Sequence, residues 1–207
     1  MYVPKQFKVE DSDKLISFIK SNSFGILFST KDGIPVATHI PFVYDEKSHR
    51  LAGHLAKQNP QAAKSEPQQA LVVFPGPHAY ISPTWYEEKN SVPTWNYVAV
   101  HVYGEMKIIQ NREEAEQILK DSITFFESNQ QELWTTDLTD SYNHALLDHI
   151  VPFEITIDRM EGAWKLNQHH SEEKQRKTIE QLLSKNDENS QQIARLMEEN
   201  NLYAKED

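Results

Sequence analysis

The spacing of apolar residues changes several times along the chain, and near the start it predicts a short amphipathic helix. Over residues 12–21, Leu15, Phe18 and Ile19 recur at intervals that place their side chains on one helical face. Asp11, or the serine that follows it, is a suitable N-cap. We therefore expect one helix here, with its apolar face turned toward a core.

The next part of the chain shows the pattern of strands. Residues 24–28 are a short apolar run, and Lys31-Asp32-Gly33 supplies the turn of a hairpin whose second strand returns over residues 34–42. Further strands are expected over residues 50–55, 70–74, 78–82, 97–109 and 153–157, the last extending toward residue 164. Because these strands are short and few helices separate them, they favour an antiparallel barrel.

Helical spacing returns late in the chain. Asn111, with Glu114 three residues further on, is a typical helix start, and apolar residues follow at helical spacing as far as Phe126. Two more amphipathic helices are predicted over residues 172–185 and 190–201, with a polar break between them.

Length and composition limit the classes of protein that fit. A chain of 207 residues suits one main domain, which we place over residues 1–170, and a C-terminal helical extension over residues 171–207. The absence of cysteine excludes a disulfide framework and a thiol nucleophile. No apolar run approaches the roughly 20 residues of a membrane-spanning helix, and no signal-peptide pattern is seen. We expect a cytoplasmic protein without membrane contact.

The charge of the chain bears on nucleic-acid binding. The formal net charge is −10, and an acidic surface repels the phosphate backbone of DNA. No helix-turn-helix pattern is evident. The only candidate basic element is the pair of C-terminal helices, where Lys174, Arg176, Lys177, Lys185 and Arg195 alternate with acidic residues.

The first segment that could carry chemistry is GHLAKQNPQ, residues 53–61. Asn59 is a good N-cap and Pro60 suits a first helical turn, so the backbone N–H groups of a following helix would point toward Lys57. A helix start beside a lysine is a frequent phosphate site. The alternative is a capped helix next to a solvated lysine, and both interpretations fit these residues.

The second segment is rich in aromatic residues. Residues 74–103 contain seven aromatic residues, among them Trp85 and Trp95, together with four prolines. Rigid aromatic loops suit a planar ligand, which they bind by stacking. They equally suit a dimer interface, where Trp and Tyr are enriched, or a packed core. Interface or core is the more frequent use of such residues.

The histidines and a late lysine complete the candidates. His144 and His149 are five residues apart, which does not align them on one helical face, and we expect no metal site. Lys165, directly after Trp164, is either an edge residue at the end of a strand or a cation near a cofactor.

Several of these segments form blocks in a characteristic order between residues 1 and 168. The blocks are MYVP (1–4) with Phe7, THIPF (38–42), GHLA (53–56) with NPQ (59–61), FPGPHAYISP (74–83) with Trp85-Tyr86, VPTWNY (92–97) with Val100-His101, and Lys165-Leu166 with Gln168. In this order they resemble the PaiB-type family, also described as FMN-binding negative transcriptional regulators. The ordered set is far more specific than any single motif.

The resemblance implies a fold, a cofactor and an assembly. The fold would be mainly β with helices, a flavin-reductase-like antiparallel split barrel, forming a homodimer with FMN-type clefts at the subunit interface. Residues 57–61 would take the FMN phosphate, and Thr38, His39 and the Trp95-Asn96 segment would approach the isoalloxazine. The candidate cofactor-binding residues are Thr38, His39, His54, Lys57, Asn59, Gln61, Trp85, Trp95, Asn96 and Lys165. No residue is assigned a catalytic role.

Two functions follow from the resemblance. The first is a dimeric repressor of sporulation and degradative-enzyme genes that senses a flavin-like ligand and acts through DNA or a protein partner. The second is an FMN-dependent oxidoreductase, because a flavin performs the redox chemistry and the protein need supply only orientation and a water-poor cleft. A third interpretation is an interaction protein that keeps the cleft without using it.

Overall fold

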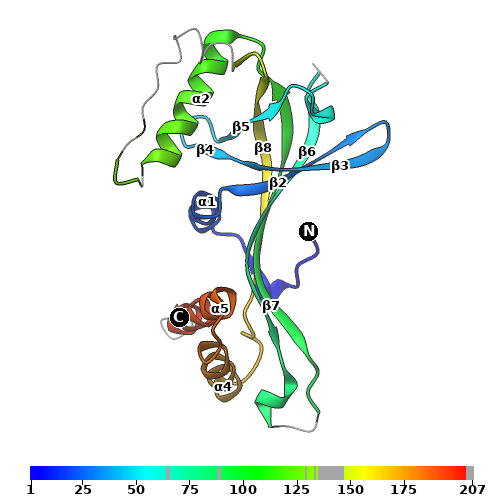
Figure 1. The fold of residues 1–207 in the computed structure, drawn as a ribbon. Helices are drawn as coiled ribbons and strands as arrows, with labels where there is room; N and C mark the ends of the chain where they lie inside the picture. Colours follow the sequence, from blue (N-terminus) through cyan, green and yellow to red (C-terminus); the bar gives the residue numbers. More distant parts are fainter. Residues whose placement is uncertain (64–65, 88–89, 129, 133, 135–146, 204–207) are drawn as a thin grey trace. The chain divides into compact units, whose positions relative to one another are not determined.

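The main element of the protein is a predominantly antiparallel sheet (Figure 1). A computed structural model describes the chain except for residues 64–65, 88–89, 129, 133, 135–146 and 204–207. The strands are β1 (Lys8–Val9), β2 (Phe24–Lys31), β3 (Ile34–Pro41), β4 (Val43–Asp45), β5 (Arg50–Ala56), β6 (Gln68–Ile81), β7 (Thr94–Ile108) and β8 (Ile150–Lys165). Their order is β3-β2-β6-β7-β8-β5-β4, with β1 paired to β8. The predicted antiparallel split-barrel class is confirmed, and the sheet is not closed.

The predicted hairpin of β2 and β3 is confirmed, and its turn explains the register. Asp32 and Gly33 both have positive φ angles, 53° and 78°, as a two-residue hairpin turn of the favoured type requires. The register places Leu27 opposite Thr38 and continues to Phe24 opposite Pro41. Gly33 supplies one of the positive φ angles without steric cost.

The two strands expected over residues 70–74 and 78–82 are one strand, β6, and that prediction was wrong. The prolines at 75 and 77 suggested a break, because proline cannot donate to a strand ladder. In the structure, however, β6 pairs with β2 from Leu71 to Val73. Pro75 and Pro77 therefore lie beyond that ladder, and their missing N–H groups do not interrupt it.

The predicted helices are confirmed with small shifts of their ends. They are α1 (Ser12–Ser21), α2 (Arg112–Glu127), α4 (Glu172–Leu183) and α5 (Glu188–Tyr203). A carboxylate oxygen of Asp11 accepts a hydrogen bond from the backbone N–H of Asp13 at 2.9 Å, and Oδ1 of Asn111 accepts one from the N–H of Glu114 at 3.0 Å. These caps satisfy N–H groups that a helix start leaves free.

Three single turns of 3-10 helix complete the described elements: η1 (Lys5–Phe7), η2 (Pro60–Ala62) and η3 (Pro83–Tyr86). The helix expected to begin at Pro60 is thus only the turn η2. The connection must reach the start of β6 at Gln68, and the side chain of Gln61 is buried, which holds the turn close to the sheet.

The chain forms two compact units, each described separately. The central unit consists of Ile16–Phe74 and His101–Met160, and the terminal unit of Met1–Leu15, Pro75–Val100 and Glu161–Asp207. The terminal unit contains α4 and α5, which pack against each other. The prediction that residues 171–207 are a separate extension stays a prediction.

Each unit has its own core. In the central unit, the Phe42 ring packs edge-on against Phe74 and Phe153, with ring centroids 5.5 and 6.1 Å apart. In the terminal unit, Leu182 and Ile193 of the C-terminal helices are fully buried. Among the described residues, no helix is both long and apolar enough to cross a membrane.

A close approach between β7 and β8 requires glycine at position 104. A Cβ atom built there would lie 2.1 Å from the carbonyl oxygen of Thr156 and 2.8 Å from Cγ2 of Ile155. We expect Gly104→Ala to lower the free energy of unfolding by about 2–4 kcal/mol, because the strands must move apart. Urea denaturation measures this loss.

Gly33→Ala is the matched control. Its φ of 78° strains an alanine, but nothing lies within 4 Å of the added Cβ atom. We expect a loss of about 1 kcal/mol from backbone strain alone. Equal losses for the two variants would show that the strand contact at Gly104 is not tight.

Candidate functional site

The ten candidate cofactor-binding residues divide between the two units. The central unit holds Thr38, His39, His54, Lys57, Asn59 and Gln61, and the terminal unit holds Trp85, Trp95, Asn96 and Lys165. Within each unit, the structure shows which of these residues meet.

Three of the central candidates form one hydrogen-bonded cluster. The Thr38 hydroxyl donates to Oε1 of Gln61 and accepts from Nδ2 of Asn59 at 3.0 Å. Nε2 of Gln61 donates to Oγ of Ser29 at 3.0 Å and to the carbonyl of Leu27 at 3.3 Å. Gln61 is only 2% exposed. The cluster therefore ties η2 to the β2–β3 hairpin.

This cluster changes the interpretation of the turn after β5. Oδ1 of Asn59 also accepts a hydrogen bond from the backbone N–H of Gln61 at 2.9 Å, so the cap is satisfied within the protein. Because η2 is a single turn, it lacks the summed dipole of a longer helix. Any phosphate contact in this segment depends mainly on the side chain of Lys57.

Lys57 lies outside that cluster. Its backbone N–H donates to the carbonyl of His149 at 2.8 Å, and its exposed side chain borders a cavity of about 420 Å³. Arg112 and Asp148 border the same cavity and form an ion pair with each other at 3.1 Å. The ammonium group of Lys57 makes no ion pair or hydrogen bond with any described residue, which leaves it available to an anion.

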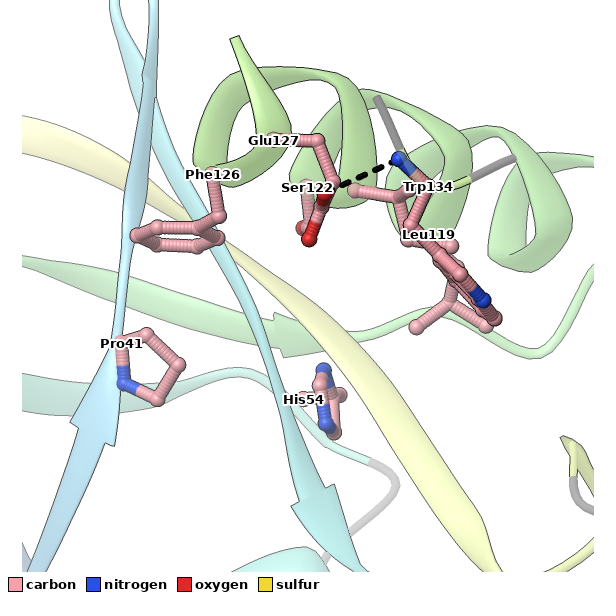
Figure 2. Close-up of a pocket in the computed structure, with 8 residues that line it drawn as sticks. Pro41, His54, Leu119, Ser122, Phe126, Glu127 and Trp134 are labelled. Carbon is pink, nitrogen blue, oxygen red and sulfur yellow. Dashed lines mark hydrogen bonds between the residues drawn. The ribbon is translucent and has the colours of Figure 1, made fainter. Parts of the chain in front are cut away.

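The two central histidines occupy different surroundings. His39 is exposed on β3, and its ring stacks on Phe24 with centroids 6.4 Å apart. His54 is half-buried on β5 and points toward α2, at a cavity of about 210 Å³ (Figure 2). Burial lowers the pKa of His54, because it disfavours the charged imidazolium.

Metal ligands are not grouped in the described part of the chain. No cluster of three histidine or acidic residues there could hold a metal ion. His144, which was weighed as a ligand from the sequence, lies outside the described residues.

In the terminal unit, Lys165 and Trp95 meet. The ammonium group of Lys165 donates to the hydroxyl of Thr94 and, at 2.9 Å, to the carbonyl of Trp95. Burial lowers the pKa of Lys165. The indole of Trp95 is 53% exposed, and its ring centroid lies 5.8 Å from Tyr80 and 6.0 Å from His78. The ammonium group of Lys165 is thus fixed at the backbone of an exposed tryptophan.

Asn96 and Trp85 contact the C-terminal helices instead. Asn96 is fully buried, and its Nδ2 donates to the sulfur of Met197 at 3.5 Å. The ammonium group of Lys185 lies 4.9 Å from the Trp85 ring. The aromatic segment therefore serves partly as the packing surface for α4 and α5, as the core interpretation of these residues predicts.

A polar cluster of the terminal unit was missed from the sequence. Asn167 is buried with a φ of 61°, and its Nδ2 donates to the hydroxyl of Tyr86 at 2.9 Å. A second contact reaches the hydroxyl of Thr178 on α4 at 3.5 Å. This cluster fixes the turn between β8 and α4. Asparagine tolerates a positive φ, but no local pattern identifies its distant partners.

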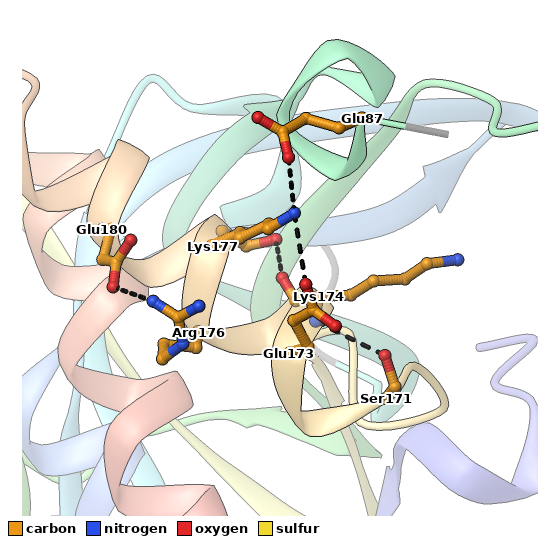
Figure 3. Close-up of polar contacts among 8 residues, drawn as sticks. Glu87, Ser171, Glu173, Lys174, Arg176, Lys177 and Glu180 are labelled. Carbon is orange, nitrogen blue, oxygen red and sulfur yellow. Dashed lines mark hydrogen bonds and ion pairs between the residues drawn. The ribbon is translucent and has the colours of Figure 1, made fainter. Parts of the chain in front are cut away.

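Two basic side chains of α4, those of Arg176 and Lys177, are compensated by carboxylates (Figure 3). The ammonium group of Lys177 lies 2.7 Å from a carboxylate oxygen of Glu87 and 3.3 Å from one of Glu173. Arg176 pairs with Glu180 one turn along the helix. Such exposed pairs add little stability, but they cancel the local positive potential.

Two residues of the terminal unit have the chemistry that suits the ring system of a flavin. The exposed Trp95 ring offers a stacking face to a planar ring system. The Lys165 ammonium group has three N–H donors and uses two of them on Thr94 and Trp95, which leaves one for a flavin carbonyl. In the central unit, Lys57 has no side-chain partner among the described residues, so its ammonium group suits an anion. The cluster around Gln61 holds the turn in place, and its hydrogen bonds are made to other residues of the protein.

Comparisons with known proteins show the family of the chain. Residues 1–159 match a family model described as a putative FMN-binding domain. The chain is 39% identical over 204 residues to the protease synthase and sporulation protein PAI 2 of Bacillus subtilis, covering 96% of this chain and 97% of that protein.

Two solved structures show the same fold. The flavocytochrome Anf3 from Azotobacter vinelandii aligns with a TM-score of 0.64 at 11% identity, over 84% of this chain and 77% of that one. An FAD and heme binding protein from Mycobacterium smegmatis aligns with a TM-score of 0.57 at 16% identity, over 76% and 73%. At these identities the likeness concerns the fold alone.

The cluster around Gln61 predicts a measurable loss of stability. We expect Gln61→Leu, which keeps the size of the side chain, to lower the free energy of unfolding by about 2–3 kcal/mol, because buried partners lose their hydrogen bonds. Gln58→Leu, at an exposed position nearby, should change it by no more than about 0.5 kcal/mol. Urea denaturation measures the free energy of unfolding of both variants. If Gln61→Leu is as stable as Gln58→Leu, the hydrogen bonds of the Gln61 amide do not stabilise the fold.

Proposed function

This chain belongs to the family of putative FMN-binding domains, and from that premise we propose that it is a flavin-binding regulatory protein. The observation that carries the proposal is the family match over residues 1–159, joined to an open antiparallel sheet of the kind found in flavin-binding structures. The family description supports FMN, or a related flavin, as the cofactor.

Two side chains of the terminal unit are the best candidates to hold the flavin ring. In the central unit, Lys57 is a separate candidate for a phosphate contact, because its ammonium group has no partner among the described residues. The exposed Trp95 ring suits stacking on the isoalloxazine, and Lys165, bound to the Trp95 carbonyl, suits a hydrogen bond to a flavin carbonyl. The flavin itself would supply hydride and electron transfer when bound.

The regulatory part of the proposal comes from the Bacillus subtilis relative. That protein is named for protease synthesis and sporulation, and it aligns with 96% of this chain. We infer for this chain a role in regulating such processes, as a repressor, in the cytoplasm and as a homodimer. Exposed Tyr80 and Trp95 support the dimer, because tyrosine and tryptophan are enriched at protein interfaces.

The charges favour regulation through a protein partner over direct DNA contact. The net charge is −10, and Arg176 and Lys177, two of the three candidate basic residues of α4, are paired with carboxylates. A DNA-binding surface needs uncompensated cations that release counterions from the phosphates. The described part of α4 does not present such a surface at these two positions.

A second function, a flavin-dependent oxidoreductase, is favoured by one feature. Lys165 is held by Thr94 and by the backbone carbonyl of the exposed Trp95, and its pKa is lowered by burial. A fixed cation with a lowered pKa beside a flavin would stabilise negative charge on the reduced ring. The protein would then need no further acid or base for hydride transfer.

Titration with FMN tests the cofactor and the phosphate contact separately. We expect saturable binding by the wild-type protein, seen as a change in the flavin spectrum. Lys57→Ala should weaken it about tenfold or more, because a charge-assisted hydrogen bond is lost. Lys120→Ala removes an exposed lysine of α2 outside the candidate set and should leave the affinity unchanged.

The outcomes separate the hypotheses. Absence of binding to the wild-type protein would refute the flavin proposal, whereas equal affinity for wild type and Lys57→Ala would refute only the phosphate contact. Adding NAD(P)H to the FMN complex then distinguishes the two functions. Steady oxidation of the nucleotide would favour the oxidoreductase, and binding without turnover would favour the regulator.

A gel-shift series across salt concentrations tests how the regulator acts. We expect the purified protein alone not to retard promoter fragments of sporulation or protease genes at any salt concentration. Retardation that weakens steeply as salt increases would show direct phosphate contact and would overturn the partner-mediated mechanism.

A further inference from the structure

A cavity of about 210 Å³ lies in the central unit between the end of β3, strand β5 and helix α2 (Figure 2). Its walls are mostly apolar. Pro41 comes from β3, and Leu119, Ile123 and Phe126 come from successive turns of α2. Side chains at this helical spacing share one face of the helix, so α2 covers one side of the cavity with apolar side chains.

The polar side chain opposite this apolar face of α2 is His54. It is half-buried on β5 and points toward α2 in Figure 2. Neither ring nitrogen has a hydrogen bond to any described residue. Burial lowers the pKa of His54 and so favours the neutral imidazole, which offers one donor and one acceptor nitrogen.

Two other polar groups at the cavity, those of Ser122 and Glu127, are hydrogen-bond acceptors, whereas the indole N–H of Trp134 is a donor. The Ser122 hydroxyl donates its hydrogen bond to the carbonyl of Ile118, at 2.8 Å, and its oxygen can still accept one. The Glu127 carboxylate accepts from the backbone N–H of Trp134 at 3.1 Å and cannot donate when ionised. With the acceptor nitrogen of His54, the cavity holds more acceptors than donors. A molecule that donates a hydrogen bond complements it.

The volume sets the size of that molecule. An apolar cavity of about 150 Å³ accommodates benzene, so about 210 Å³ leaves room for one ring and a substituent. Sites for larger ligands have volumes of about 300–1,000 Å³, and FMN is far too large for this one. Thr38, Lys57 and Asn59, which were grouped with His54 as flavin candidates, do not line it.

We propose that this cavity is a binding site for a single-ring aromatic molecule that carries one hydroxyl or N–H group, as phenols do. The ring packs against Leu119 and Phe126, and its donor bonds to the imidazole of His54. This assigns His54 to a ligand other than the flavin. The inference goes beyond the proposed function and does not depend on it.

Phenol and toluene are matched probes, because they have nearly the same shape and differ in the donor. Titration of each into the wild-type protein is followed by NMR of ¹³C-labelled histidine side chains. The His54 signal is identified by its absence in His54→Phe. We expect phenol to shift it saturably, with a dissociation constant of about 1 mM, as is usual for so small a ligand.

Two variants and one control separate the hydrogen bond from the cavity itself. His54→Phe keeps a ring but loses the acceptor, so phenol should bind about tenfold more weakly while toluene binding, followed by ¹³C-labelled methyl signals, is retained. Ser122→Phe places a ring in the cavity and should abolish binding of both probes. His149→Phe makes the same exchange at an exposed histidine that does not line the cavity, and both affinities should stay unchanged. Circular dichroism confirms that each variant is folded.

Three outcomes would overturn the proposal. The first is no saturable shift of His54 with phenol. The second is an equal phenol affinity for wild type and His54→Phe, which would mean that the imidazole is not the partner. The third is competition between phenol and FMN, which would make the cavity part of a flavin site. Failure of FMN to bind at all leaves the phenol result unaffected, so the two proposals fail separately.

Discussion

The buried amide of Gln61 is the interaction on which the candidate region of the central unit depends. It joins a turn that follows β5 to strands that precede it by more than twenty residues, through Thr38 and Ser29. A buried amide is costly unless its donors and acceptors are satisfied, so the turn and the hairpin can adopt this arrangement only together. This requirement for satisfied hydrogen bonds also fixes the position of Asn59 and of the chain between His54 and Asn59.

The fold could be predicted wherever the determinants are local. Asp32-Gly33 fixes the hairpin, and Asn111 with Glu114 fixes the start of α2, because caps and turns act within four residues. The continuity of β6 through Pro75 could not be predicted this way. It depends on where the ladder with β2 ends, which is a property of the folded sheet.

The candidate site was predictable in residue type but not in arrangement. Trp95 and Lys165 were both identified from the sequence, and the structure brings them together. By contrast, Gln61 and Asn96 were candidates because the family resemblance implies that their segments approach the FMN phosphate and ring, yet their side chains bond within the protein. A motif does not show whether a polar group faces a ligand or a neighbouring strand. That distinction requires the partners, which lie up to a hundred residues away.

The distribution of tryptophan gives each unit its own optical reporter. Trp134 is the single tryptophan of the central unit and is 56% exposed, at the rim of the cavity under α2. The terminal unit contains the buried Trp164, the half-buried Trp85 and the exposed Trp95. Replacing the three terminal indoles by phenylalanine would leave emission from the central unit alone. Local events in the two halves of the molecule could then be followed by fluorescence one at a time.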